Sequence, residues 1–344
     1  MSLWKSIPNC DTLRPCLSLR TNSQILYPMP ALPPDHEARV QRALVSLQGL
    51  SVGDSFGERF FGPPGRAQEL IAKRLPPPPK WSYTDDTAMA LSVVDTLVEH
   101  GRIDQDYLAI AFAKRFNDEP DRGYGGGARQ ILDSIGAGVS WRIAAAEPFG
   151  GEGSQGNGAA MRVAPLGAYF ADDIDSLVDQ ALASAQVTHL HPDGQAGAVA
   201  VALAAAFAWQ SRDSTTPPSA ADLLRFVESR MPPSETRQGV RTALSLPSTT
   251  TVDQAASALG AGYRITSADT VPFSLWCASR SLSDYEAALW ATVSALGDRD
   301  TTCAIVGGIV VLSAGLHSIP ERWILSRESL SLRYRPRPQG LPNP

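Results

Sequence analysis

Apolar residues recur at helical spacing along most of this chain, and this periodicity limits its fold more than any other feature. Residues Val40, Ala43, Leu47 and Leu50 fall on one side of a helix, because a helix completes a turn every 3.6 residues. Similar runs occupy residues 108–116, 128–135, 196–209, 223–231, 252–259 and 284–296. The alternating pattern of a half-buried strand is nearly absent. The sequence therefore predicts an all-α protein with roughly ten or more helices.

The helical pattern predicts one domain over residues 36–326. A chain of 344 residues can hold one large domain or two ordinary ones. Residues 1–35 contain scattered Pro, Ser and Asn with little periodicity, so we expect a poorly ordered N-terminal extension. Residues 327–344 are rich in Arg and Pro, and we expect a mobile tail there.

The composition excludes several classes of partner. A net charge of −5 provides no general attraction to nucleic acid or to an anionic membrane. No apolar stretch reaches the roughly 18 residues of a membrane span, and no signal peptide is evident. The four cysteines form no CxxC pair, which fits a reducing compartment. We therefore expect a cytoplasmic protein, and we expect a monomer because nothing in the sequence signals an obligate interface.

Two short acidic clusters each precede an apolar, helix-like run: TDDT at residues 84–87 and DRDTT at residues 298–302. Asp and Thr are common at helix N-termini, where they bind unpaired backbone amides, so each cluster alone can be a cap. Two carboxylates at one helix start exceed what a cap needs. If the two starts face each other, four carboxylates converge, and divalent cations would offset their repulsion. Oxygen ligands favour Mg²⁺ or Mn²⁺ over Zn²⁺.

Two glycine-rich segments are predicted to be loops: GYGGG at residues 123–127 and GGEGSQGNG at residues 150–158. Glycine lets backbone amides approach a ligand closely, and successive amides form a nest for an anion. The second segment, which contains Ser154 and Asn157, is therefore a candidate pyrophosphate cradle. Two ordinary surface turns would explain the same composition.

Six motifs occur in a fixed order along the chain: GDSFG at 53–57, YTDDT at 83–87, GYG at 123–125, GSQGNGAAMR at 153–162, TH at 188–189 and GDRDT at 297–301. This ordered set resembles the ADP-ribosylglycohydrolase family over about residues 38–325. That family includes the dinitrogenase-reductase-activating glycohydrolase and the ADP-ribosyl-acceptor hydrolases. The run GNGAAMRV at 156–163 is closer to the serine-type branch of those hydrolases than to the arginine-type branch.

The resemblance implies a single-domain orthogonal bundle of helices that hydrolyses the glycosidic bond between ADP-ribose and an acceptor side chain. It also implies a binuclear centre of two Mg²⁺ ions, with Mn²⁺ as the alternative. The metal ligands implied by motif match are Thr84, Asp85 and Asp86 for one ion, Asp298 and Thr301 for the other, and Asp300 between them. A carboxylate, Asp86 or Glu58, would assist proton transfer at an oxocarbenium-like transition state, and Asp300 would be required for turnover.

The resemblance also implies how ADP-ribose is held. The diphosphate would lie on the loop made of Ser154, Gln155, Gly156, Asn157 and Gly158. Gly125 and Gly127 would line the same cleft, and His189 would lie near the diphosphate or a ribose. Phe149 matches a position where an aromatic ring stacks on adenine. The expected partner is an ADP-ribosylated protein or a small molecule that contains ADP-ribose.

The chain departs from the family pattern at two positions. Gln155 stands where close relatives carry an aromatic residue, so one stacking partner of adenine is missing. Phe61 stands where serine-type relatives carry a Glu on a flap, which leaves Glu58 or another carboxylate as the acid or base. Two alternatives therefore stay open: an ADP-ribose-binding protein with little catalysis, and a hydrolase of a small metabolite such as O-acetyl-ADP-ribose.

Overall fold

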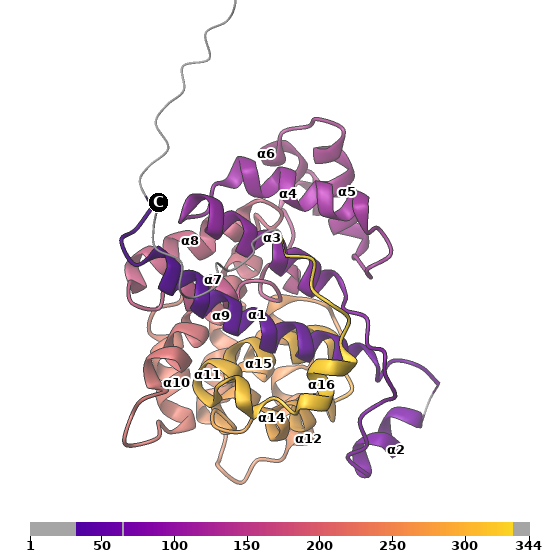
Figure 1. Cartoon of the computed structure of the whole chain (residues 1–344), viewed down its shortest axis with the longest axis vertical. Helices are drawn as coiled ribbons and strands as arrows, with labels where there is room; N and C mark the ends of the chain where they lie inside the picture. The colour runs from indigo at the N-terminus through magenta and orange to yellow at the C-terminus, as the bar shows by residue number, and fades with distance from the viewer. Residues whose placement is uncertain (1–31, 64, 333–344) are drawn as a thin grey trace, which may run out of the picture. The chain divides into compact units, whose positions relative to one another are not determined.

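The structure, a computed structural model, describes residues 32–63 and 65–332 of the chain (Figure 1). These residues form sixteen α-helices and three short 3-10 helices, and they contain no β-strand beyond two isolated bridges. The prediction of an all-α protein is confirmed. The predicted N-terminal extension lies outside the described residues except for 32–35, and the predicted C-terminal tail does so from residue 333 onward.

All of these helices belong to one compact unit. The α-helices are α1 His36–Glu58, α2 Arg66–Ala72, α3 Asp85–His100, α4 Gln105–Asp118, α5 Gly126–Gly136, α6 Trp141–Ala144, α7 Ala164–Tyr169, α8 Ile174–Gln186, α9 Pro192–Ser211, α10 Ala220–Glu228, α11 Glu235–Ser245, α12 Val252–Leu259, α13 Ser267–Arg280, α14 Tyr285–Val293, α15 Arg299–Ala314 and α16 Glu321–Ser326. The 3-10 helices are η1 Pro148–Gly151, η2 Asn157–Ala159 and η3 Leu316–Ser318.

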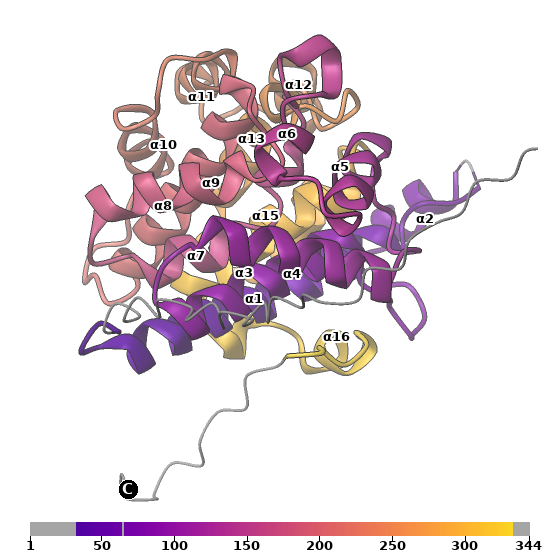
Figure 2. The ribbon, with the colours of Figure 1, turned by 90° about the horizontal axis from the view of Figure 1, so that it is seen from above.

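The helices α1 and α15 form the most extensive pair, and Figure 2 shows the yellow α15 passing beside α1 and α3. Their backbones come unusually close because glycines of α1 face α15. A Cβ at Gly53 would lie 2.1 Å from the carbonyl oxygen of Cys303, and a Cβ at Gly57 would lie 2.1 Å from that of Arg299. Only glycine fits such distances, so these two positions bring the C-terminal half of α1 against the start of α15.

One buried carboxylate ties the start of α3 to α1. The carboxylate of Asp54, in α1, accepts hydrogen bonds from the backbone N and the Oγ1 of Thr84 at 3.0 and 2.9 Å. It also accepts hydrogen bonds from the backbone N and the Oγ1 of Thr87 at 3.1 and 2.5 Å. Thr84 in turn caps α3, because its side chain accepts a hydrogen bond from the Asp86 amide. The first turn of α3 is thereby held beside the last turns of α1.

A cluster of aromatic rings packs next to these helix ends. Phe56 of α1 stacks on Trp323 of α16, with ring centroids 4.4 Å apart and an interplanar angle of 18°. Trp81, Phe60 and Trp290 meet the ring of Phe56 edge-on. Burying one such side chain stabilises a fold by roughly 1.5–3 kcal/mol. This cluster therefore anchors α16 and the segment before α3 to α1.

The chain after α16 returns to the segment before α3, and Figure 1 shows this yellow segment crossing toward α3. The Trp81 amide donates to the Ser326 carbonyl at 2.7 Å, and the Glu328 amide donates to the Trp81 carbonyl at 2.9 Å. Arg327 and Trp81 form one of the isolated bridges. Residues 327 and 328, where the predicted tail begins, therefore contact the helical unit.

Candidate active site

Five carboxylates from three helices gather where these helix ends meet. Asp54 comes from α1, Asp85 and Asp86 come from the first turn of α3, and Asp298 and Asp300 come from the start of α15. The first three are buried, and the two from α15 are partly exposed. The structure therefore brings together the two acidic clusters that lie more than two hundred residues apart in the sequence.

Burial raises the pKa of every carboxyl group in this cluster, and repulsion by neighbouring carboxylates adds to the effect for all of them except Asp54. Burial is the largest cause for Asp298, whose pKa rises to about 7, and the charge of Asp300 adds to the effect. Burial also raises the pKa of Asp86 well above its ordinary value, again with Asp300 as the next cause. Burial is also the largest cause of the raised pKa of Asp54, Asp85 and Asp300, and the charge of Asp54 adds to the effect for Asp85 and Asp300. Like charges held this close favour a bound proton or a bound cation.

Helix capping explains only part of this arrangement. Thr84 is the residue whose side chain caps α3. Asp298 occupies the N-cap position of α15 but makes no capping hydrogen bond. Its Oδ2 instead accepts a hydrogen bond from Nδ2 of Asn157 at 2.7 Å. The carboxylate of Asp298 therefore links the start of α15 to the glycine-rich segment instead of capping its own helix.

The oxygen atoms of this cluster suit hard divalent cations. Oδ1 of Asp86 and Oδ1 of Asp300 are buried and have no hydrogen-bond partner. A buried oxygen that carries charge and lacks a partner is strongly unfavourable, so a positive ligand is expected there. Among the described residues, no group of three His, Cys, Asp or Glu side chains is arranged to hold a metal ion. Hydroxyl groups such as those of Thr84 and Thr301, together with water, would complete an oxygen shell of the kind that Mg²⁺ and Mn²⁺ take.

A pocket of about 420 Å³ opens beside the acidic cluster. This volume lies within the range of small-molecule sites, about 300–1,000 Å³. The predicted site residues that line it are Asp85, Asp86, Asp298, Asp300, Thr301, Gly125, Gly127, Phe149, Ser154, Gln155, Gly156, Asn157, Gly158 and His189. The remaining two, Thr84 and Glu58, line a second cleft instead. One pocket therefore joins both glycine-rich segments to four of the five carboxylates.

His189 lies against the glycine-rich loop and is hydrogen-bonded to Thr188. Its Nδ1 lies 2.7 Å from Oγ1 of Thr188, and this oxygen accepts a hydrogen bond from Nη2 of Arg162 at 2.9 Å. With the Thr188 hydroxyl as the donor to Nδ1, the proton of the neutral ring lies on Nε2. Burial, with the nearby Arg162 charge, lowers the pKa of His189 to about 3. A neutral N–H donor therefore faces Gly156 and Gly158, where it suits a ligand oxygen.

Two exposed apolar side chains border the same pocket from strained backbone. Phe149 and Ile265 have φ angles of 58° and 56°, and 63% of each residue's surface is exposed. A positive φ is unfavourable for bulky residues and is retained where the surroundings enforce it, often at functional sites. The Ile265 carbonyl accepts a hydrogen bond from the Asn157 amide at 3.2 Å, and the Gln155 carbonyl accepts one from the Ser267 amide at 3.0 Å. These bonds fasten the two loops together at the pocket.

A second cleft of about 710 Å³ lies beside this pocket and shares two lining residues with it, Gly123 and Asp300. Its other lining residues are Glu58, Phe61, Ser82, Tyr83, Thr84, Asp118, Glu119, Pro120, Asp121 and Arg122. Glu58 is partly buried, and this burial raises its pKa. The side chain of Phe61, whose exposed fraction is 44%, packs against the guanidinium of Arg299 at 4.5 Å. The second cleft thus begins at the acidic cluster, with Asp300 in its wall.

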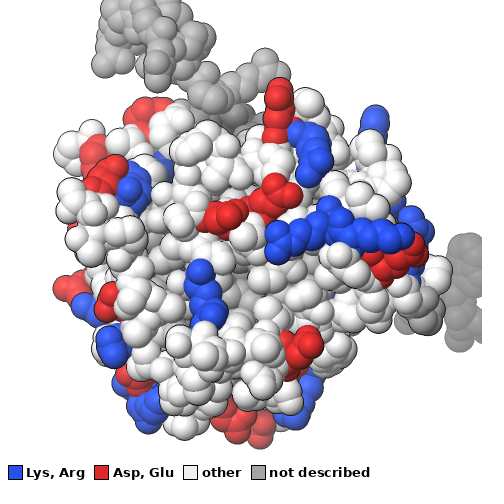
Figure 3. Space-filling view, turned by 90° about the horizontal axis from the view of Figure 1, so that it is seen from below, with Lys and Arg blue, Asp and Glu red and all other residues white. Residues whose placement is uncertain are grey.

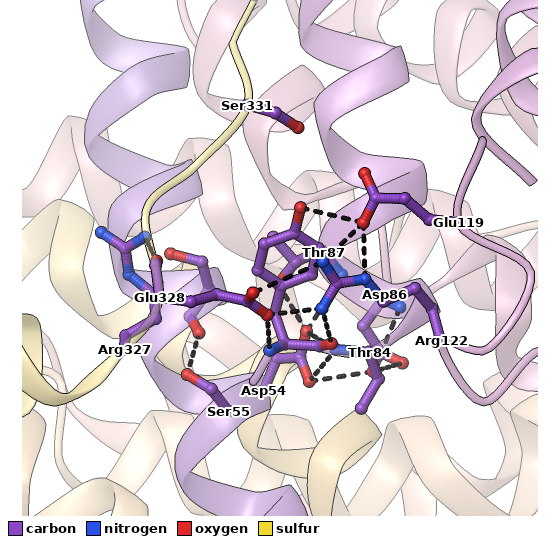
Figure 4. A network of polar contacts seen from close by, with 12 residues as sticks. Asp54, Ser55, Thr84, Asp86, Thr87, Glu119, Arg122, Arg327, Glu328 and Ser331 are labelled. Carbon is purple, nitrogen blue, oxygen red and sulfur yellow. Dashed lines mark hydrogen bonds and ion pairs between the residues drawn. The ribbon is translucent and has the colours of Figure 1, made fainter. Parts of the chain in front are cut away.

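The C-terminal segment holds the backbone on both sides of the second cleft, and Figure 4 shows this network. Oε1 of Glu328 accepts hydrogen bonds from the Tyr83 amide at 2.7 Å and from Nη1 of Arg122 at 2.5 Å. Arg122 also donates to Glu119, and its carbonyl accepts a hydrogen bond from the Asp85 amide at 2.7 Å. Glu328 therefore holds Tyr83, which directly precedes the first acidic cluster, and Arg122, whose backbone is hydrogen-bonded to Asp85 of that cluster.

Four residues with clear roles in this geometry are absent from the predicted site: Asp54, Arg162, Ile265 and Glu328. Asp54 and Arg162 lie inside motifs that the sequence displays, GDSFG and GSQGNGAAMR. Ile265 and Glu328 lie in segments without any motif, and only their tertiary contacts reveal them.

Charged side chains of both signs are interspersed over the face of the molecule that Figure 3 shows. No helix among the described residues combines the length and the apolar character that crossing a membrane requires.

An all-α unit that places several carboxylates and a glycine-rich anion loop around one pocket has the groups that hydrolysis of a phosphate-bearing glycoside requires. The comparison with known families agrees with this class. The family model described as ADP-ribosylglycohydrolase matches residues 35–334, so the chain belongs to the ADP-ribosylglycohydrolase family. The prediction of a glycohydrolase is confirmed.

Curated relatives support this membership. ADP-ribosylhydrolase ARH3 of Xenopus tropicalis is 28% identical over 326 residues, which cover 85% of this chain and 92% of that protein. ADP-ribosylhydrolase ARH3 of Homo sapiens is 29% identical over 275 residues, which cover 72% and 74%. A solved structure titled ADP-ribosylglycohydrolase-related protein complex superimposes with a TM-score of 0.60 at 24% identity, covering 84% of this chain and 93% of that one. The solved structure supports the fold.

Proposed function

We propose that the protein hydrolyses the glycosidic bond between ADP-ribose and an acceptor side chain, with divalent cations as cofactors. One observation carries this proposal: the carboxylates Asp85, Asp86, Asp298 and Asp300 line the same pocket as the loop 154–158. A diphosphate on the loop would direct the distal ribose toward the carboxylates. Family membership supports the class of reaction, and the shared pocket supports the placing of the substrate.

The residues of the pocket divide the binding of ADP-ribose among them. The loop 154–158 and the Nε2–H of His189 would hold the diphosphate, because amides, hydroxyls and a neutral N–H all donate to phosphate oxygens. The exposed ring of Phe149 would stack on adenine, with Ile265 near it on the adjoining loop. Gly125 and Gly127 border the same ring from open space: a Cβ at Gly125 would meet no atom within 4 Å, and one at Gly127 would only touch the Phe149 ring at 3.7 Å.

The acidic cluster would hold two Mg²⁺ or Mn²⁺ ions. The proposed ligands are Thr84, Asp85 and Asp86 for one ion and Asp298 and Thr301 for the other, with Asp300 shared. The unpartnered oxygens of Asp86 and Asp300 support this assignment. When bound, such ions orient the ribose hydroxyls, lower the pKa of a water molecule and offset developing charge.

Proton transfer would fall to Asp86 or Glu58. Glu58 and Asp300 both line the second cleft, whereas Glu58 does not line the pocket that contains the loop 154–158. Burial raises its pKa, which helps a carboxyl group to hold a proton near neutral pH and to give it to a leaving acceptor. We therefore propose Glu58 as the acid for the leaving group, in place of the flap Glu whose position Phe61 occupies.

Within this function we favour a serine-linked acceptor, since the run GNGAAMRV at 156–163 resembles the serine-type branch. We further propose a cytoplasmic monomer. Cys277 and Cys303 are free and buried, which fits a compartment where thiols stay reduced.

Release of free ADP-ribose tests the proposal directly. Proteins modified separately on serine and on arginine, together with O-acetyl-ADP-ribose, would be incubated with Mg²⁺ or Mn²⁺ and with EDTA, with Asp300→Ala as the matched variant. Cation-dependent release that the variant lacks supports the hydrolase, and the substrate that reacts identifies the linkage. Binding of ADP-ribose in calorimetry without any release would instead support a binding protein, with Phe61 at the flap position as the structural reason.

A further inference from the structure

The second cleft adjoins the acidic cluster at Asp300, a position that suits the group attached to the distal ribose of ADP-ribose. Asp300 and Gly123 line both the pocket and the second cleft. If ADP-ribose occupies the pocket with its distal ribose at the carboxylates, whatever is attached to that ribose must leave the cluster by another opening. The second cleft, of about 710 Å³, provides an opening next to Asp300.

We propose that the second cleft binds the acceptor and that it selects a positively charged peptide segment. This inference rests on the proposed function, because it assigns the acceptor side of the same reaction. It concerns the sequence around the modified side chain, which the pocket for ADP-ribose does not contact.

Carboxyl groups outnumber cations among the described lining residues of the second cleft. Its described residues include five carboxyl groups, Glu58, Asp118, Glu119, Asp121 and Asp300, and one guanidinium, that of Arg122. Arg122 is already held between Glu119 and Glu328, so its charge is offset inside the wall. Asp118 is exposed but already forms an ion pair with Lys114 at 2.8 Å, so the carboxylate of Asp121, which is also exposed, is the one that can meet a cationic side chain entering from solvent. A concave surface with this balance attracts cations and repels anions.

The aromatic part of the lining suits the same ligand. The guanidinium of Arg122 lies 3.9 Å from the centre of the Tyr83 ring. The guanidinium of Arg299 lies 4.5 Å from the centre of the Phe61 ring. Tyr83 is buried under Arg122, whereas Phe61 remains 44% exposed and is the ring of this cleft that a ligand can reach. Aromatic faces beside carboxylates are the surroundings that lysine and arginine side chains prefer. An acidic acceptor would meet repulsion from Asp121 without any unpaired cation in the lining to offset it.

A pair of peptides measures this selectivity. Both would carry one ADP-ribose on the residue type that the wild-type protein releases, with lysines beside it in one peptide and glutamates in the other. We expect kcat/KM to be about 10-fold higher for the lysine peptide at low salt, since a few exposed ion pairs contribute this much together. The difference should reside in KM, and added salt should reduce it.

Two charge-reversing substitutions distinguish an effect of the second cleft from an effect of the protein's net charge. Asp121→Lys changes the rim of the cleft, and Asp179→Lys makes the same change at an exposed position of α8 outside both cavities. We expect Asp121→Lys to bring the ratio of kcat/KM between the two peptides close to one, and Asp179→Lys to leave the ratio unchanged. Equal ratios in the wild type and in both variants would overturn the inference.

Failure of the inference is distinguishable from failure of the proposed function. If the wild-type protein releases ADP-ribose from both peptides at equal rates, the proposed function is supported and the inference about the second cleft is contradicted. If the wild-type protein, with cations present, releases ADP-ribose neither from the peptides nor from O-acetyl-ADP-ribose, both the proposed function and the inference are contradicted.

Discussion

Replacing Asp298 by Asn should stabilise the protein in the absence of divalent cations, although Asp298 belongs to the proposed metal site. Burial, followed by the charge of Asp300, raises the pKa of Asp298 from 3.8 to about 7. In the unfolded chain this carboxyl group ionises near its ordinary pKa, so above that pH folding must transfer a charge into a poorly solvated site. The wild-type protein therefore loses stability as pH rises from the unfolded to the folded pKa, and the neutral Asn side chain does not.

The two pKa values of Asp298 set the magnitude of this effect. Each pH unit between them corresponds to about 1.4 kcal/mol, so the gain in the variant reaches at most about 4 kcal/mol near pH 8 and vanishes near pH 3. Asn has nearly the size of Asp, and its oxygen can still accept the hydrogen bond from Nδ2 of Asn157. Packing should therefore change little.

Urea denaturation in EDTA, followed by circular dichroism across this pH range, measures the free energy of unfolding. Asp179→Asn, at an exposed position of α8, is the control and should show no gain. Added Mn²⁺ should stabilise the wild-type protein more than Asp298→Asn, because the variant lacks one charged ligand. The reasoning is refuted if Asp298→Asn is no more stable than the wild type at high pH, or if the difference does not depend on pH.

Three further perturbations test other parts of the site. Asp54→Asn should weaken Mn²⁺ binding in calorimetry by about 10- to 100-fold with unchanged helix content, because Asp54 orients Thr84 without lining the pocket. Burial lowers the pKa of His189 to about 3, so the wild type should lose roughly 2 kcal/mol of stability between neutral pH and pH 5, where the unfolded ring takes up a proton. His189→Asn should not show this acid loss in urea titrations. Glu328→Gln should lower the free energy of unfolding by about 1 kcal/mol, because it breaks the ion pair with Arg122, whereas Glu321→Gln on the exposed side of α16 should change it little.

The helices and their starts were predictable from short stretches of sequence. Apolar spacing and capping residues act within one or two turns, so the beginning of α3 after Thr84 and of α15 at the DRDTT cluster follows from neighbours in the chain. The same holds for the loops 123–127 and 150–158, where glycine allows backbone angles that other residues avoid. These local rules identified the acidic helix starts and the glycine-rich loops, and the family resemblance, rather than the local rules, grouped them into one site.

The contacts between distant segments were not predictable in this way. The approach of α1 to α15 depends on Gly53 lying opposite the carbonyl of Cys303, two hundred and fifty residues later, and no local pattern specifies such a pair. Glu58 illustrates the consequence, because the sequence places it among the catalytic candidates while the structure places it in the second cleft, apart from the loop 154–158.

The sequence by itself determined which elements form and which chemical groups they carry: helices with acidic starts, and glycine-rich loops suited to an anion. Only the tertiary structure decided how these groups share space. It directed Asp298 toward Asn157, placed the Thr188 hydroxyl against Nδ1 of His189, and separated two cavities at Asp300. The physical reason is that helix formation depends on interactions within a few residues, whereas the burial, hydrogen bonds and pKa of a site depend on packing between helices far apart in the chain.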